Sequence, residues 1–554
     1  MRRPLTPIVF LFLLAACGDI ATDGPVGGTV IIGASADADA LLPPLAGSVQ
    51  GRAVSELLFD RLAEMGPALN VTGDRGFAPR LARSWRWSLD SLAITFALDA
   101  DARWHDGHPV RAADVAFGFH VIRDSANGSS LVADIGNIDS VTTPDSLSVI
   151  VHFARRAAEQ FYAATLITPL PKHVLGDLPP GALRTSEAAR APVGSGRFRF
   201  VEWQPKSRLE LAAVEDHYRG RPRLDRVVFS VTPEPATGLA RVWAGESDVW
   251  EPLTPIDVTE AAKYEQVRVF SGPGFDYGFL AFNFRDRRNP SRPHPLFAER
   301  EMRRAITMAV DRDALRQAIF GALAMRSYGP FTRPQNTSDT TITQIPFDRA
   351  AAAKTFDSLG WRAVGTDGIR RRGAQRLSFA INIPTSSAVR NRAAVLLQEQ
   401  LRQVGIGATI EAMEFGTFFT RMQSGDFDAT ISGWRTSPSP GGIRGAWGSA
   451  AISRGARQNA GMYENPVFDA AVEQGLGALD IATRRAHMRR AYQTIVDDAA
   501  AIWLYEVRNA AAVHRRFNVP LWRSEAWWLT LADWSVDPEQ RLPRDTRPTS
   551  GTAP

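Results

Sequence analysis

The chain has 554 residues, of which 44% are hydrophobic and 22% are charged. This balance supports packed domains, about three at roughly 100–200 residues each, and excludes a disordered chain. The formal net charge of +5 is small for the length and is not gathered into basic runs, which argues against nucleic-acid binding. The single cysteine, Cys17, excludes an internal disulfide.

The first residues form an export signal that ends at this cysteine. Residues 1–3, Met-Arg-Arg, form a short basic region, and residues 7–16 are apolar. Such a run is too short to cross about 30 Å of hydrocarbon, but it suits a secretory signal peptide. Residues 14–17, Leu-Ala-Ala-Cys, match the lipobox at which bacteria cut the signal and lipidate the cysteine thiol. An ordinary signal peptide with a chance cysteine is the alternative. We expect a signal peptide at 1–16 and a lipidated tether at 17–28.

Strand-like patterns dominate the first half of the chain. Alternating or β-branched runs predict strands at 29–33 and 92–98 and a hairpin at 141–153. Helical spacing of apolar residues predicts helices at 54–62 and 112–122. We therefore expect a strand-rich first part.

Helix-like and strand-like segments alternate in the second half. Periodic apolar residues predict helices at 299–320, 349–359 and 390–404. Strands are predicted at 377–383 and 408–410. This order is typical of α/β units with parallel strands.

Motifs of common enzymes are missing from the sequence. It has no Gly-x-x-x-x-Gly-Lys loop, no His-Glu-x-x-His and no Gly-x-Ser-x-Gly. With Cys17 lipidated, no thiol nucleophile remains. His105, Asp106 and His108 could ligate a transition metal, or they could form a polar turn around Gly107. Because no further ligand cluster is visible, we expect no metal. Because the catalytic motifs are missing, we also expect no cofactor and no enzymatic activity.

Several segments resemble one known family. They are Leu-Ala-Arg-Ser-Trp at 81–85, Ala-Arg-Trp-His-Asp-Gly-His-Pro-Val at 102–110, Ala-Ala-Asp-Val at 112–115, Pro-Lys-His at 171–173, Pro-Val-Gly-Ser-Gly at 192–196, Gly-Asp-Phe-Asp at 425–428 and Gly-Trp at 433–434. They are similar to the signatures of the extracellular solute-binding proteins of family 5, the peptide- and nickel-binding proteins of bacterial ABC importers.

The resemblance implies an α/β, two-lobed periplasmic-binding-protein fold in the class with an extra subdomain. The ligand cleft lies between lobes that close about a hinge. A final strand-like segment around 503–505 returns to the first lobe. The expected division is lobe I at 29–55, 190–270 and 510–538, its subdomain at 56–189, lobe II at 271–509 and a polar tail at 539–554.

The resemblance also implies ligand contacts at the Gly-Trp pair. In peptide-binding members, an Asp three residues after this Trp takes the peptide's α-ammonium. Here Arg435 follows Trp434, and Ser437 stands at the Asp position. A buried ammonium needs a partner charge, so a neutral, glycan-like or anionic ligand becomes an alternative to a peptide. We expect Trp434, Arg435 and Ser437 to bind ligand; a core Trp and a solvated loop Arg are the alternatives.

Further ligand contacts are expected near strand ends. Ser386, Ser387 and Arg390 lie where a strand ends and a helix begins, which suits an anion or a plain helix cap. Residues 42–43, Leu42 and Pro43, follow the first strand and contact ligand backbone or form a structural turn. Tyr277, near the expected interlobe crossing, contacts ligand or is a core aromatic.

Together these patterns predict a lipid-anchored binding protein on the extracytoplasmic face of a bacterial membrane. In the periplasm the protein, acting as a monomer, would capture a peptide or another small solute. It would deliver this solute to the permease subunits of an ABC importer. A ligand-binding chaperone or a sensor subunit is one alternative, and a secreted hydrolase is another. The choice between inner and outer membrane stays open.

Overall fold

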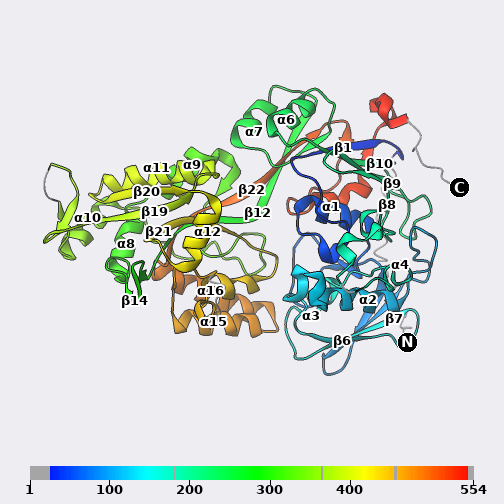
Figure 1. The fold of residues 1–554 in the computed structure, drawn as a ribbon, viewed down its shortest axis with the longest axis horizontal. Coiled ribbons are helices and arrows are strands. Elements are labelled where there is room, and N and C mark those ends of the chain that lie inside the picture. The colour runs from blue at the N-terminus through cyan, green and yellow to red at the C-terminus, as the bar shows by residue number, and fades with distance from the viewer. Residues whose placement is uncertain (1–24, 180, 364–365, 454–457, 547–554) are drawn as a thin grey trace, which may run out of the picture.

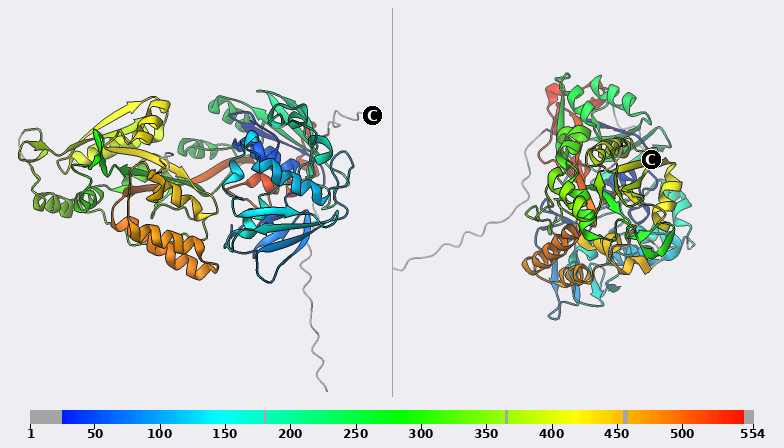
Figure 2. Two further views of the ribbon diagram at one scale, coloured as in Figure 1. Left: turned by 60° about the horizontal axis from the view of Figure 1, so that its bottom comes forward. Right: turned by 90° about the vertical axis from the view of Figure 1, so that its left-hand side faces the viewer.

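The computed structural model describes residues 25–179, 181–363, 366–453 and 458–546. The chain folds into two lobes joined by two long strands (Figure 1). These strands are β12 (Val267–Phe282) and β22 (Ala501–His514), which pair antiparallel from Val267 opposite His514 to Ala281 opposite Ala501. The left view of Figure 2 also shows the two lobes side by side. This is the two-lobed α/β architecture that the sequence predicts.

One mixed sheet runs through both lobes. In the described part of the chain it has eleven strands, with β15 pairing beside β22 and the others in the order β20-β19-β21-β12-β22-β11-β1-β10-β9-β8. Its further members are β20 (Gly407–Met413), β19 (Ser378–Pro384), β21 (Ala429–Arg435), β15 (Ala324–Met325), β11 (Val249–Trp250), β1 (Thr29–Ala34), β10 (Arg226–Val231), β9 (Arg208–Ala213) and β8 (Phe198–Gln204). β19 lies parallel to β20, as predicted, and it also lies parallel to β21. β22 ends against β11 of lobe I, so the last long strand does return there.

Lobe I combines the β1 half of this sheet with a smaller four-stranded sheet. The smaller sheet has the order β4-β5-β7-β6. Its strands and the neighbouring helices are β4 (Ala82–Trp87), β5 (Ala93–Leu98), β6 (Ile138–Thr142), β7 (Ser148–Phe153), α1 (Val49–Leu58), α2 (Ala112–Arg123), α3 (Gln160–Thr165), α4 (Lys172–Leu175) and α5 (Glu187–Arg190). Ile94 and Phe96 of β5 are fully buried, and they share one hydrophobic core with Val30 of β1. The two sheets are therefore packed as one body.

Lobe II covers its end of the large sheet with helices. They are α8 (Arg300–Met308), α9 (Arg312–Phe320), α10 (Arg349–Ser358), α11 (Ala388–Arg402), α12 (Phe415–Ser424), α13 (Ile443–Trp447), α14 (Ala450–Ser453), α15 (Pro466–Gly477) and α16 (Ile481–Asp497). The prediction of one helix over 299–320 is wrong, because the chain breaks into α8 and α9. Asp311 leaves the helical conformation there, and its Oδ1 accepts the amide of Ala314 at 2.9 Å. This carboxylate starts a second helix instead of continuing the first.

The remaining elements are short. They are β2 (Ala63–Met65), β3 (Phe77–Pro79), α6 (Pro235–Trp243), α7 (Pro255–Ala261), β13 (Arg285–Asp286), β14 (Asn289–Pro293), β16 (Arg362–Ala363), β17 (Arg370–Arg372), β18 (Gln375–Arg376), β23 (Phe517–Asn518) and β24 (Ser535–Val536). Tryptophans of the last segment form a stack, with the rings of Trp522 and Trp527 5.5 Å apart and nearly parallel. This stack closes the lobe I core near the end of the chain.

The structure does not describe the first 24 residues, but it describes the C-terminal segment up to residue 546. The predicted signal peptide and Cys17 lie outside the described residues. The segment expected to be a polar tail from residue 539 is packed in part, because Asp545 is buried and pairs with Arg516 at 2.7 Å. No helix among the described residues has the length and apolar character that a membrane crossing requires.

Candidate ligand-binding site

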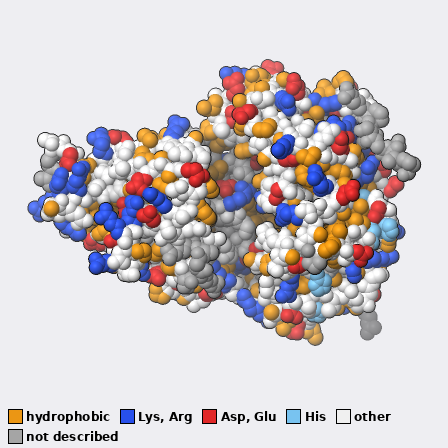
Figure 3. Space-filling view, in the orientation of Figure 1, with side chains coloured by type: hydrophobic (Ala, Val, Ile, Leu, Met, Phe, Trp, Pro, Cys, Tyr) orange, Lys and Arg blue, Asp and Glu red, His pale blue; other side chains and the backbone are white. Residues whose placement is uncertain are grey.

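A cavity of about 480 Å³ lies between the two lobes. Lobe I contributes α1 and the segments around Tyr162 and Trp528, and lobe II contributes residues 435–438. Figure 3 shows the surface hollowed between the lobes. The volume falls within the range of about 300–1,000 Å³ that is common for small-ligand sites.

A second hollow, of about 670 Å³, is larger but has a different position. It is lined by Trp104, His217 and their neighbours, all from lobe I. Movement of one lobe against the other would not open or close it. The interlobe cavity is therefore the better candidate, because its walls come from both of the lobes that β12 and β22 join.

Two of the predicted ligand contacts, Arg435 and Ser437, line the interlobe cavity. Arg435 ends β21 directly opposite Asp276 of β12. Its Nη1 donates to Asp276 Oδ2 at 2.9 Å, so its charge is already balanced within lobe II. Burial raises the pKa of Asp276, while the nearby Arg435 lowers it. Arg435, the predicted cation for an anionic ligand, is therefore already engaged in an ion pair with Asp276.

The loop after β21, residues 436–440, contains two serines and no acidic residue. It contacts an acidic residue of lobe I, Glu159. The Oγ of Ser437 donates to the carbonyl of Ser439 at 3.2 Å. The Oγ of Ser439 donates to Glu159 Oε2 at 2.7 Å. Glu159 also forms an ion pair with Arg484 of α16. A carboxylate thus reaches this loop across the lobes, but Arg484 neutralises it.

The structure places the other predicted contacts away from this cavity. Among the described residues that line it, Trp434, Tyr277, Leu42, Pro43, Ser386, Ser387 and Arg390 are absent. Trp434 is half-buried beside Trp447 in a narrow gap of lobe II. Tyr277 is 3% exposed and accepts a hydrogen bond from Trp447 Nε1 at 3.0 Å, within an aromatic core. Leu42 is buried in lobe I, and Pro43 begins a 3-10 turn after it.

The predicted anion segment forms a helix cap. The Oγ of Ser387 accepts the amide of Arg390 at 3.4 Å, at the start of α11. The guanidinium of Arg390 lies over the ring of Phe418, 5.6 Å from its centroid. Ser386 is exposed beside this cap. The cap explains why a serine-rich strand end is found here.

Several lining residues carry no motif that would have identified them. Tyr162 lies on α3, where burial raises its pKa to about 12. Asp134 lies nearby, and its pKa is raised by its enclosure and by Glu159. No sequence motif marks Trp528, whose Nε1 donates to Glu56 Oε2 at 2.7 Å. Their proximity depends on tertiary folding, which sequence spacing does not record.

The charges that line the cavity are nearly balanced. Among the described lining residues there are seven arginines and six acidic residues. The pairs are Arg61 with Glu56, Arg80 with Glu64, Arg197 with Asp533, Arg219 with Asp60, and Arg523 with Glu525. Although burial opposes ionisation of Asp60, Arg219 and His217 hold its pKa well below its usual range. The wall is therefore polar without a strong field of one sign.

Comparison with known proteins gives the same architecture. The chain is 25% identical over 490 residues to the oligopeptide-binding protein AppA of Bacillus subtilis, covering 86% of this chain and 87% of AppA. The structure of the ABC transporter substrate-binding protein CtaP of Listeria monocytogenes matches with a TM-score of 0.80 at 21% identity, over 92% of this chain and 99% of CtaP. NikA of Brucella suis matches with a TM-score of 0.77 at 19% identity, over 92% and 100%.

The predicted two-lobed fold is therefore confirmed. The family model described as bacterial extracellular solute-binding proteins, family 5 middle, matches residues 76–451, more than half of the chain. Members of this family are binding proteins, so the prediction that the chain is not an enzyme is confirmed as well. The chain belongs to the bacterial extracellular solute-binding proteins of family 5.

Proposed function

We propose that the chain is a lipid-anchored receptor that captures a small, peptide-like solute between its lobes and delivers it to an ABC importer. The interlobe cavity of about 480 Å³, with walls from both lobes, carries this proposal. The hinge strands β12 and β22 let the lobes approach each other around a solute. Delivery then follows when the lobes separate at the permease.

The relatives support a peptide-like solute of modest size. AppA of Bacillus subtilis has a structure in complex with a nonapeptide, at 23% identity to this chain. DppA of Helicobacter pylori has one in complex with the peptide STSA, at 20% identity. Peptides carry both donors and acceptors, which suits a wall of balanced charge. Because Ser437 offers no carboxylate, the bound solute does not depend on a free α-ammonium at that position.

Mass spectrometry of the solute that co-purifies with the chain tests the proposal. We expect a compound that carries amide groups and has a blocked or absent amino terminus. A co-purified zwitterionic oligopeptide would leave solute capture intact but contradict the interpretation of Ser437. A chain that binds no solute from a periplasmic or culture extract would contradict solute capture itself.

Lipid anchoring is supported by residues 14–17 and by their place after an apolar run. Labelling with radioactive palmitate tests it in a bacterial host. The wild-type chain should incorporate the label and sediment with membranes, and Cys17→Ala should do neither. A labelled Cys17→Ala chain would contradict lipidation of this thiol.

A further inference from the structure

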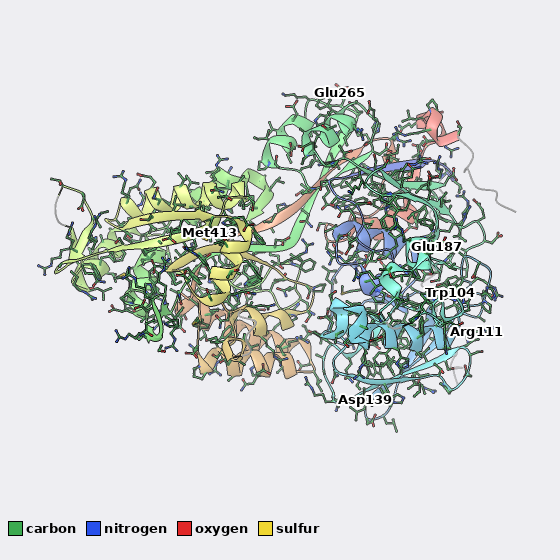
Figure 4. All side chains as sticks on the ribbon, viewed as in Figure 1. Trp104, Arg111, Asp139, Glu187, Glu265 and Met413 are labelled. Atoms are coloured by element: carbon green, nitrogen blue, oxygen red, sulfur yellow. The ribbon has the colours of Figure 1, made fainter. Side chains whose placement is uncertain are left out.

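Three metal-ligand side chains meet on lobe I, outside the interlobe cavity. Asp106, His108 and His173 each offer one ligand atom, and these atoms lie within 4.8 Å of one another. Asp106 Oδ2 is 2.7 Å from His173 Nε2, and Asp106 Oδ1 is 3.2 Å from His108 Nδ1. The side chain of His108 is 63% exposed, so an ion can reach the cluster from solvent. Trp104, which precedes this loop, lies on the side of lobe I that faces away from lobe II (Figure 4).

His105 is adjacent in sequence but is not part of the cluster. Its Nδ1 accepts the amide of Gly194 at 3.2 Å, and its Nε2 lies 2.9 Å from the carbonyl of Gly196. Both ring nitrogens therefore bond to backbone, and Nε2 is the one that carries the proton. Burial lowers the pKa of His105 to about 4, so the ring stays neutral. The third ligand comes instead from His173 of α4, which sequence spacing alone does not reveal.

The loop that carries Asp106 and His108 is held by its own backbone. The amide of Gly107 donates to the carbonyl of Trp104 at 2.8 Å, and the amide of Trp104 donates to the carbonyl of His108 at 2.8 Å. Gly107 has a φ of +88°, which a side chain would disfavour. The turn therefore presents both ligand side chains from a fixed base.

Asp114 joins this loop to the helix that carries His173. Asp114 is 5% exposed, and its Oδ2 accepts the indole N–H of Trp104 at 3.2 Å. Its Oδ1 accepts the amide of Lys172, the first residue of α4, at 3.1 Å. One buried carboxylate thus fixes both halves of the cluster, as supporting residues do in metal sites.

We propose that Asp106, His108 and His173 bind a divalent transition-metal ion of the zinc and nickel class on the surface of lobe I. Two imidazoles and one carboxylate suit such ions better than magnesium or calcium, which prefer oxygen ligands. Bonds of about 2.0–2.2 Å place neighbouring ligands about 3.4 Å apart around a tetrahedral ion. The observed spacings need only small side-chain rotations to reach this geometry, and water completes the coordination.

Zinc binding to the full chain, purified in detergent with a tag that lacks histidine, tests the proposal. Isothermal titration calorimetry with zinc chloride should show a site that His108→Ala weakens at least about tenfold. His120→Ala is the matched control, because His120 is an exposed histidine on α2 of the same lobe, and it should leave the affinity unchanged. Magnesium chloride should not compete. Cys17 is present in every variant, so any contribution from its thiol cancels.

Cobalt(II) gives a second reading, because its visible absorption reports directly on nitrogen ligands. Wild-type and His120→Ala chains should give the same spectrum, and His108→Ala should lose part of it. His173→Ala should have the same effect as His108→Ala; if it fails to fold, the exposed His108 still decides the outcome. A chain that binds no zinc, or that binds zinc equally well without His108, overturns the proposal.

Discussion

Glu159 of lobe I and Arg484 of lobe II form an ion pair that joins the two lobes, although they are 325 positions apart in the chain. The side chain of Arg484 is 1% exposed, and its Nη2 donates a hydrogen bond to Glu159 Oε1. Among the described residues, no hydrogen-bond partner meets the buried Nε and Nη1 of Arg484. Ser439 adds a second bond to Glu159 from lobe II. This carboxylate therefore holds the lobes together beside the cavity.

Replacing Glu159 by glutamine should shift the chain towards separated lobes. The variant leaves a buried guanidinium without its counter-charge, which costs roughly 1–3 kcal/mol in the closed arrangement. Small-angle X-ray scattering should show a larger radius of gyration without added solute. Glu464→Gln is the control, because Glu464 pairs with Arg285 within lobe II. Equal radii for both variants would mean that the pair does not hold the lobes.

Much of the fold follows from the sequence, because apolar periodicity reflects which face is buried. The β5 strand, α2, α10 and α11 lie within a few residues of their predicted bounds. Apolar periodicity does not reveal the break between α8 and α9, because the period continues through it. Asp311 is a helix interior residue by that period and a cap by its hydrogen bond. Local capping chemistry overrode periodicity there.

Removing this cap should destabilise lobe II. Asp311→Ala deletes the acceptor for the amide of Ala314, and such caps contribute about 1 kcal/mol. We expect the midpoint of thermal unfolding of the variant to fall by about 2–4 °C. Differential scanning calorimetry measures this. Asp311→Asn keeps an acceptor oxygen and should recover most of the loss; an equal loss in both variants would point to a cause other than the cap.

The site was predictable only where a motif marks it. The Gly-Trp pair located the loop that carries Arg435 and Ser437, and both line the cavity. Spacing could not show that Trp434 turns towards the core of lobe II, since neighbouring strand residues point to opposite faces. Asp134 and Tyr162 lie far away in the chain and reach the cavity only through packing of lobe I against lobe II.

Introducing an acid at Ser437 should create affinity for a free amino terminus. Ser437→Asp adds a carboxylate to the cavity wall, where an ammonium group would gain a partner charge. Calorimetry with a tripeptide and its N-acetylated form should show about tenfold tighter binding of the free tripeptide alone, equivalent to about 1.4 kcal/mol. Ser437→Asn has the same shape without charge and should bind both forms equally. A gain with Ser437→Asn, or a gain for the acetylated peptide, would exclude charge as the cause.

The stability of the hinge should depend on pH through Glu506 of β22, which lies opposite Tyr277. Glu506 is fully buried; its Oε2 accepts the amide of Arg333 at 2.9 Å, and burial raises its pKa from 4.5 to about 7 while Arg333 opposes the shift. The folded chain therefore keeps a proton that the unfolded chain releases above pH 4.5.

The contribution of Glu506 to the free energy of unfolding is thus fully present below about pH 4.5, and it is lost as the pH rises through about 7. Across this window the loss amounts to about 3 kcal/mol in the free energy of unfolding. Glu506→Gln cannot ionise at this position, so its stability relative to the wild type should rise from pH 5 to pH 7.5 in urea unfolding experiments.

Glu251, whose pKa burial also raises to about 7, is present in both chains and cancels in the comparison. The exposed Glu265 provides the control, and Glu265→Gln should follow the wild type at both pH values. If Glu506→Gln also follows the wild type, Glu506 is ionised in the folded chain throughout this range.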